Sequence, residues 1–191
     1  MTGAVTRLQS LPQILDAAAL QRSLERLSHE IVERQGDTEE LLLAGILTRG
    51  LPIARRIARN VARFSGAEPQ VCGVDVTGFR DDRPHDPGVR SAPVTDERGG
   101  PAPVNGRSVI LVDDVLYTGR TVRAALDALM SQGRPRGVEV LILIDRGHRE
   151  LPLRATYVGK NVPTATSETV KVRLRETDGV DGAWLIPGAD P

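Results

Sequence analysis

Four predominantly apolar runs, set between helical or turn-rich segments, constrain the fold of this chain more than any other feature. The runs cover residues 41–47, 71–76, 108–112 and 138–144. A helical pattern follows the first run over residues 51–64, and another follows the third over residues 121–132 and stops at Gly133. Strands that are apolar on both faces and alternate with helices are typical of a parallel sheet covered by helices. We therefore expect an α/β fold with a central, mostly parallel sheet flanked by helices.

The two ends of the chain show different patterns. From Asp16 onward, Leu20, Leu24, Leu27 and Ile31 recur at helical spacing, which predicts a helix with one buried stripe. Near the other end, residues 168–176 alternate apolar and basic side chains, as in a half-exposed strand, and residues 183–186 could pair back on it. Between the two ends, residues 77–107 are rich in proline, glycine and charge, which favours a lid, an extended hairpin arm or disorder.

The composition fits a single domain over residues 1–191. Lys and Arg total 25, as do Asp and Glu, so no overall charge draws the chain to nucleic acid or anionic lipid, and such a partner needs a local patch. Cys72 is the only cysteine, which excludes an internal disulfide and suits a reducing compartment. No apolar stretch approaches the roughly 20 residues that span a bilayer. We expect a cytoplasmic protein with no membrane partner.

Three polar clusters come directly after proposed strands: residues 48–50, 113–121 and 145–149. Ligands of open α/β sheets bind beyond the carboxyl ends of the strands. One crevice could therefore collect all three clusters.

The stretch LVDDVLYTGRT, residues 111–121, contains the most specific chemistry. Asp113 and Asp114 are good acceptors for sugar hydroxyl groups, while Thr118 to Thr121 bring small residues and backbone N–H groups to a helix start that favours an anion. Together they predict a site for a ribose 5-phosphate. The alternative is that an acid merely caps a helix and that Thr-Gly forms a turn. The phosphate-binding P-loop pattern and the dinucleotide glycine fingerprint are both absent.

Residues 109–121, VILVDDVLYTGRT, resemble the 5-phosphoribosyl 1-pyrophosphate (PRPP) motif of type I phosphoribosyltransferases. GILTRGLPIARRIA, ALDALMSQGRP and IDRGHRELPLRATYVGKNVPT further resemble the PyrR family, over roughly residues 20–185. The resemblance implies the type I phosphoribosyltransferase fold, with a flexible arm at 77–107 and a hood with C-terminal strands at 151–191. It also implies two activities: uracil phosphoribosyltransfer, in which uracil and PRPP give UMP and pyrophosphate, and UMP-dependent binding of a pyrimidine-operon mRNA leader hairpin, which promotes transcription attenuation.

The same resemblance implies roles for individual residues. Asp113 and Asp114 would hold the ribose hydroxyl groups, residues 118–121 the 5-phosphate, and residues 48–50 the pyrophosphate, with Arg49 providing a two-pronged contact. PRPP would arrive with Mg2+, so no dedicated metal site is expected in the protein. The expected catalytic residues are Asp113, Asp114 and Arg49, and the expected PRPP-binding residues are Thr48, Arg49, Gly50, Val112, Asp113, Asp114, Val115, Leu116, Tyr117, Thr118, Gly119, Arg120 and Thr121.

Three further sets of residues follow from the resemblance. Uracil would be read by Asp145, Tyr157 and Val158, and the lid would include Arg80, Asp81 and Asp82. The RNA contacts would be Arg22, Arg26, His29, Arg146, His148, Arg149, Arg154 and Lys160, although the polar face of the first helix could also be only a solvated surface. The family suggests a homodimer or homotetramer.

Two positions depart from the family pattern. Glu25 places an acid on the first helix, where it would repel RNA phosphates, and VTGFRDD replaces the usual TLYRDD at the start of the arm. Two alternatives therefore remain beside the bifunctional reading: an RNA-binding attenuator with vestigial catalysis, and a phosphoribosyltransferase with no RNA role.

Overall fold

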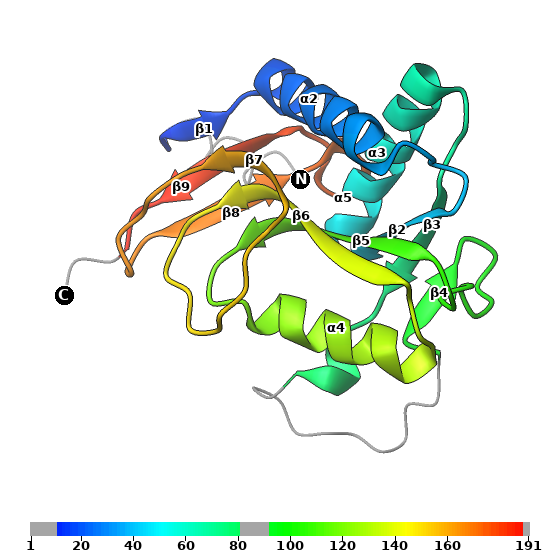
Figure 1. The fold of residues 1–191 in the computed structure, drawn as a ribbon. Helices are drawn as coiled ribbons and strands as arrows, with labels where there is room; N and C mark the ends of the chain where they lie inside the picture. Colours follow the sequence, from blue (N-terminus) through cyan, green and yellow to red (C-terminus); the bar gives the residue numbers. More distant parts are fainter. Residues whose placement is uncertain (1–10, 81–91, 189–191) are drawn as a thin grey trace.

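The computed structural model describes residues 11–80 and 92–188, and this part of the chain forms two sheets (Figure 1). The larger sheet has the strand order β4-β3-β2-β5-β6-β7, and all neighbours are parallel except β4 and β3. Its strands are β2 (Leu41–Ile46), β3 (Gln70–Val74), β4 (Val94–Asp96), β5 (Ser108–Leu116), β6 (Gly137–Asp145) and β7 (Tyr157–Asn161). This confirms the expected α/β fold with a mostly parallel central sheet.

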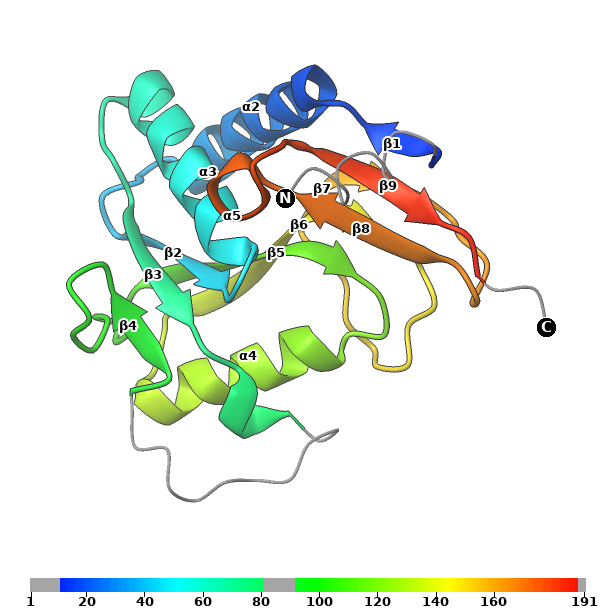
Figure 2. The same cartoon turned by 180° about the vertical axis from the view of Figure 1, so that it is seen from behind.

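Helices cover both faces of the larger sheet. Both views place α2 (Ala17–Gln35) and α3 (Gly50–Ser65) on one side of it and α4 (Arg120–Gln132) on the other (Figures 1 and 2). Because side chains alternate along a strand, Leu41 and Leu43 pack under α2 and α3, whereas Leu42 and Ala44 pack against the α4 side. Every residue of β2 is buried, which explains its unbroken apolar sequence.

The first helix begins and ends where its sequence indicates. The Asp16 carboxylate accepts a hydrogen bond of 2.6 Å from the Ala19 backbone N–H and so caps the amino terminus. At the other end, Gly36 has a φ of 67° and closes the last turn. The predicted stripe of Leu20, Leu24, Leu27 and Ile31 is fully buried.

A second, three-stranded antiparallel sheet lies beside the larger one and forms the hood. Its order is β1-β9-β8, with β1 at Gln13–Leu15, β8 at Thr169–Arg173 and β9 at Gly182–Ile186. The predicted pairing of the C-terminal segments is confirmed, since Val170 lies opposite Leu185 and Val172 opposite Ala183. The short helix α5 (Arg175–Asp178) connects β8 to β9 and lies beside α3 (Figure 2).

The structure corrects several predicted boundaries. The strand that begins at Ser108 continues to Leu116, so the acid pair lies within β5 rather than after it. Residues 157–161, expected in the hood, instead form the edge strand β7 of the larger sheet. The proline-rich segment contains a short 3-10 helix, η1 (Thr77–Phe79), and strand β4. The lid residues Asp81 and Asp82 lie outside the described residues. Among the described residues, no helix is long and apolar enough to cross a membrane.

Candidate functional site

The three polar clusters predicted from the sequence come together at one edge of the larger sheet. Strands β2, β5 and β6 are parallel neighbours, so their carboxyl ends lie side by side. Direct contacts join the clusters: the Thr118 carbonyl accepts hydrogen bonds from the Glu150 and Leu151 N–H groups, at 3.0 and 3.2 Å. In the same way, the Arg146 N–H donates to the Leu116 carbonyl at 3.1 Å. All three clusters therefore lie at the same edge of the larger sheet.

The turn before α4 surrounds a small pocket. Residues 115–122 line this pocket of about 290 Å³ together with Arg80 from the start of the arm. Gly119 has a φ of 94°, a backbone conformation that favours glycine, and this turn directs the chain into the amino terminus of α4. Unpaired N–H groups and the helix dipole make such a terminus attractive to an anion. The predicted phosphate loop and one predicted lid residue thus face a common space.

Of the two neighbouring acids beside this pocket, Asp113 is buried and Asp114 is half-buried. Asp113 is 8% exposed, and one of its carboxylate oxygens accepts a 2.9 Å hydrogen bond from the Asp114 N–H; Asp114 accepts one of 2.9 Å from the Val115 N–H. Burial raises the pKa of Asp113 well above its usual range, and the Asp114 carboxylate raises it further. Burial also raises the pKa of Asp114, although the nearby Arg49 charge offsets part of this effect. Such a pair is stabilised by hydroxyl donors or by a cation.

The turn between β2 and α3 is packed closely against β5. A Cβ atom at Gly50 would lie 2.2 Å from the Val112 carbonyl oxygen, so only glycine fits there without displacement. The peptide bond between Leu47 and Thr48 is cis. Arg49 follows, and its guanidinium donates to both carboxylate oxygens of Asp178 in α5, from Nε at 3.1 Å and from Nη2 at 2.9 Å. The predicted pyrophosphate turn is therefore held by the core on one side and by the hood on the other.

The segment after β6 is tied to the phosphate loop. Arg149 Nη1 donates to the Tyr117 carbonyl at 2.7 Å and to the Leu116 carbonyl at 3.4 Å, and the guanidinium also pairs with Asp145. Arg146 is 5% exposed; its guanidinium stacks on the Tyr117 ring at 3.9 Å and donates to Thr164 and Ala165. The prediction of a direct RNA contact from Arg146 is therefore corrected, because the side chain is buried against this loop.

The predicted base contacts divide into two groups. Asp145 is the last residue of β6 and lies at this edge of the sheet. Tyr157 instead lies opposite Leu141, in the middle of β6, and is only 2% exposed. Its hydroxyl group donates a hydrogen bond of 2.9 Å to Glu139. Val158 follows it, and its carbonyl accepts from Arg26 at 2.9 Å. Tyr157 and Val158 therefore do not lie at the crevice. The prediction failed because β7 runs parallel to β6 and reaches this edge only at its last residue, Asn161, which lies opposite Asp145.

Most of the remaining predicted RNA contacts are exposed, on α2, on β7 and in the segment after β6. Arg22 and Arg154 are exposed, and Lys160 donates to the Ile14 carbonyl at 3.0 Å. His29 stacks on Phe64 of α3 with ring centroids 3.7 Å apart. His148 has a φ of 58°, and its Nε2 lies 2.6 Å from the Thr164 carbonyl oxygen.

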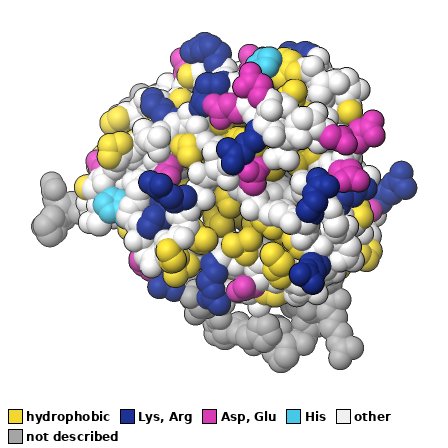
Figure 3. All heavy atoms as spheres, viewed as in Figure 1, with side chains coloured by type: hydrophobic (Ala, Val, Ile, Leu, Met, Phe, Trp, Pro, Cys, Tyr) yellow, Lys and Arg dark blue, Asp and Glu magenta, His cyan; other side chains and the backbone are white. Residues whose placement is uncertain are grey.

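One of these contacts, Arg26, is engaged within the chain, and the unfavourable acid Glu25 is compensated. Arg26 pairs with Glu30 at 2.5 Å and donates to the Gly159 carbonyl at 2.8 Å. Glu25 is paired with Arg63 of α3 at 3.2 Å, and hydrogen bonds from Gln21 and Arg63 lower its pKa. On the face seen in Figure 3, basic and acidic side chains are intermingled. An RNA interface on this face would therefore be assembled from individual side chains rather than from one extended basic area.

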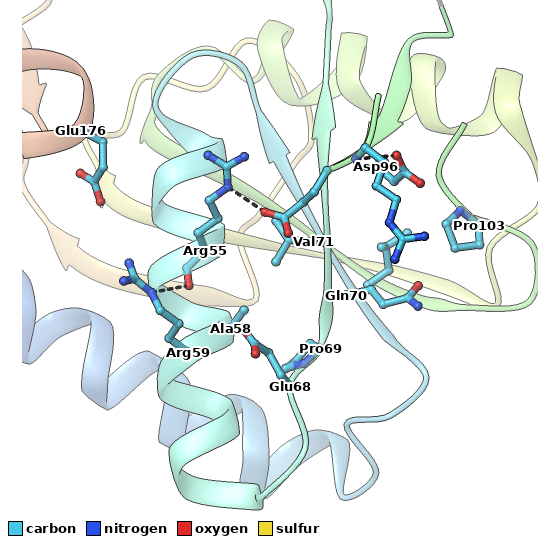
Figure 4. Close-up of a pocket in the computed structure, with 13 residues that line it drawn as sticks. Arg55, Ala58, Arg59, Glu68, Pro69, Gln70, Val71, Asp96, Pro103 and Glu176 are labelled. Carbon is cyan, nitrogen blue, oxygen red and sulfur yellow. Dashed lines mark hydrogen bonds and ion pairs between the residues drawn. The ribbon is translucent and has the colours of Figure 1, made fainter. Parts of the chain in front are cut away.

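A larger pocket, of about 720 Å³, lies away from these residues. It is bordered by α3, the start of β3 and the loop after β4, and side chains of both charges line it, with Arg55 bonded to Glu97 at 2.9 Å (Figure 4). Gln70, the first residue of β3, lies on its wall, so this pocket faces the amino ends of the strands. Its size alone does not make it the reaction site.

Within residues 11–80 and 92–188, no group of three or more His, Cys, Asp or Glu side chains could hold a metal ion.

Comparisons with known proteins agree with this geometry. Residues 10–176 match the phosphoribosyl transferase domain family. The chain is 52% identical over 172 residues to the bifunctional protein PyrR of Deinococcus deserti, covering 90% of this chain and 92% of that protein. It is 53% identical over 179 residues to the bifunctional protein PyrR of Thermus thermophilus, covering 93% and 97%.

Solved structures show the same fold at lower sequence identity. A hypoxanthine phosphoribosyltransferase from Staphylococcus aureus superposes with a TM-score of 0.68 at 19% identity, over 96% of each chain. The hypoxanthine phosphoribosyltransferase of Trypanosoma cruzi gives a TM-score of 0.67 at 16% identity, over 93% of this chain and 97% of that one.

Proposed function

The chain belongs to the PyrR family of phosphoribosyltransferases, and from this premise we propose that it is both a uracil phosphoribosyltransferase and a pyrimidine-operon regulator. The enzyme converts uracil and PRPP to UMP and pyrophosphate. The observation that carries the enzymatic half is the continuous pocket wall formed by residues 115–122 next to the buried Asp113 and the half-buried Asp114. A phosphate-binding turn beside acceptors for hydroxyl groups suits ribose 5-phosphate.

Each part of PRPP has a matching set of residues. The 5-phosphate binds the Thr118–Thr121 turn, the ribose hydroxyl groups donate to Asp113 and Asp114, and the pyrophosphate binds the turn at residues 48–50. The support is their position at one edge of the larger sheet, where the Arg49 charge lowers the pKa of Asp114. Uracil lies at the edge formed by Asp145 and Asn161, beside the backbone of Val162, whose N–H donates to the Asp145 carbonyl at 2.8 Å.

The chemistry requires positioning and charge compensation more than covalent participation by the protein. The bond between the ribose carbon and pyrophosphate breaks while the uracil nitrogen forms a new bond to that carbon, and the proton of that nitrogen passes to the departing pyrophosphate. Positive charge on the ribose in the transition state is stabilised by the neighbouring carboxylates, and Arg49 stabilises the departing pyrophosphate. Arg80, which lines the phosphate pocket, starts the segment that would exclude water from the bound substrate.

Phosphoribosyltransferases use Mg2+ with PRPP, and the donor set here fits an ion that arrives with the substrate. Mg2+ prefers oxygen ligands and needs only one or two protein carboxylates when phosphates supply the others. Asp113 and Asp114 are such carboxylates. The ion, when bound, neutralises part of the pyrophosphate charge.

The regulatory half consists of UMP-dependent binding of an mRNA leader hairpin. Exposed Arg22 and Arg154, together with His29, His148 and Lys160, supply phosphate contacts, while loop bases splay onto the surface. The Glu25–Arg63 pair supports retention of this activity, because Arg63 offsets the carboxylate that would repel RNA. We also propose a homodimer or homotetramer.

Two measurements on one preparation test both halves. Incubation with PRPP, Mg2+ and uracil should give UMP, and no product with any pyrimidine base would remove the enzymatic half. A gel shift with UMP should favour the leader hairpin over scrambled RNA and weaken as salt rises. Equal binding of both RNAs would instead favour a phosphoribosyltransferase without an RNA role, and hairpin binding without UMP synthesis would favour an attenuator with vestigial catalysis.

A further inference from the structure

Asp178 in the hood is connected to the pyrophosphate turn by a two-pronged ion pair. Its carboxylate accepts from Arg49 Nε and Nη2 at 3.1 and 2.9 Å, although the two residues are 129 positions apart in the sequence. Further donors reach the same carboxylate: Arg173 Nη1 at 2.6 Å, the Leu174 N–H at 3.1 Å and Thr177 Oγ1 at 2.8 Å. Five hydrogen bonds on two oxygens use the full acceptor capacity of a carboxylate. Asp178 is therefore fully occupied and does not itself bind a ligand.

The ion pair leaves one edge of Arg49 available. A guanidinium has five N–H donors in a rigid fork, and Asp178 takes one from Nε and one from Nη2. Both N–H groups of Nη1 and the second N–H group of Nη2 remain, and this second edge has the geometry to donate hydrogen bonds to two phosphate oxygens. The Arg49 side chain is 30% exposed, whereas that of Asp178 is only 6% exposed. Solvent therefore reaches Arg49 but hardly reaches the carboxylate that holds it.

Charge explains why an acid is needed at this position. Arg49 and Arg173 both donate to the same oxygen of Asp178, so two guanidinium groups share one anion. Hydrogen bonds from Arg49 and its neighbours keep the pKa of Asp178 well below its usual range, against the opposing effect of burial. Without this charge, two cations would lie next to each other, and repulsion would turn Arg49 away from its present orientation.

We propose that Asp178 is a positioning residue, which fixes Arg49 through its Nε/Nη2 edge so that the Nη1/Nη2 edge receives the pyrophosphate group of PRPP. This inference rests on the proposed function of the turn at residues 48–50. It adds a residue from the hood to the substrate-binding machinery. Because Asp178 acts only through Arg49, it should affect ligands that contain pyrophosphate and leave UMP, which lacks that group, unaffected.

The test compares two variants of the same short helix by isothermal titration calorimetry with pyrophosphate, with PRPP and with UMP. Asp178→Asn keeps the size of the side chain but removes its charge. Glu176→Gln is the matched control, because Glu176 forms an equivalent pair with Arg56, at 2.5 Å, which does not involve Arg49. We expect Asp178→Asn to weaken the binding of pyrophosphate and PRPP by roughly 10- to 100-fold, the usual effect of losing hydrogen bonds to a charged group. UMP affinity should be unchanged, and Glu176→Gln should bind all three ligands like the wild type.

The outcomes distinguish this inference from the proposed function. Wild-type protein that binds neither PRPP nor UMP would overturn the proposed function itself. Wild-type protein that binds both, with Asp178→Asn identical to it or with equal losses for UMP and pyrophosphate, would overturn only the role of Asp178. If Asp178→Asn does not fold, Asp178→Glu retains the charge but displaces the acceptor. It should weaken pyrophosphate selectively by a smaller factor, and wild-type pyrophosphate affinity in that variant would equally contradict the proposal.

Discussion

The turn that we propose binds pyrophosphate depends on close packing at Gly50, and substitution of this residue should impair PRPP use. In Gly50→Ala the new Cβ would lie 2.2 Å from the Val112 carbonyl oxygen, about 1.2 Å closer than an ordinary van der Waals contact. That oxygen belongs to the central strand β5, which is fixed by neighbours on both sides, so the turn itself must move. A displacement of about 1 Å in a substrate-positioning group costs on the order of 100-fold in rate.

We therefore expect kcat/KM for PRPP to fall by about 100-fold in Gly50→Ala, measured by UMP formation at saturating uracil. Overpacking of a buried position costs about 1–3 kcal/mol, so Tm should fall by several degrees. Gly137→Ala is the matched control: Gly137 starts β6, and a Cβ there would meet nothing within 4 Å. The control should keep wild-type kinetics and stability. Gly50→Ala with wild-type kcat/KM would refute the assignment of this turn to PRPP binding.

Three further predictions concern other parts of the molecule. The buried Asp113 has a raised pKa, and such an acid destabilises the folded state as pH rises from its pKa in the unfolded chain through its pKa in the folded one. Asp113→Asn should therefore raise Tm near pH 7 and give no such increase below about pH 4. The variant should also form less UMP. A Tm gain independent of pH would contradict this reasoning. Tyr157→Phe removes a hydroxyl group that is hydrogen-bonded to Glu139, so it should lower the free energy of unfolding by about 1 kcal/mol and leave KM for uracil unchanged. A raised KM would instead indicate that Tyr157 contributes to uracil binding. Arg63→Ala should weaken hairpin binding more when Glu25 is present than in a Glu25→Gln background, because the carboxylate of Glu25 is left uncompensated only when Glu25 is present. Equal effects in the two backgrounds, measured by gel shift, would show that the Glu25–Arg63 pair does not affect RNA binding.

The features that were predictable from the sequence are those with a local signal. The strand β2 and the stripe on α2 follow from apolar periodicity, since every residue of β2 and each leucine of that stripe is buried. The acid pair and the Thr-Gly turn are adjacent in the chain, so their chemistry could be inferred together. Their position within β5 rather than after it could not, because strand length depends on pairing with β6.

The features that were missed depend on contacts between distant residues. Strand β7 contains glycine, lysine and asparagine and has no apolar period, so its place in the larger sheet had no sequence signal. The base edge that we propose at Asn161 depends on that place and had no signal either. Asp178 is an unremarkable acid in a short helix until the fold brings it to Arg49. The burial of Arg146 likewise results from tertiary stacking on Tyr117 and reverses the expectation for a basic residue in a polar loop.

The central claim is that the Asp113–Asp114 pair and the Thr118–Thr121 turn together hold a ribose 5-phosphate. A crystal structure of the complex with UMP tests it most directly. We predict the phosphate within hydrogen-bonding distance of the backbone N–H groups of residues 118–121, and at least one ribose hydroxyl donating to Asp113 or Asp114. UMP bound elsewhere, with this crevice containing only solvent, would contradict the claim.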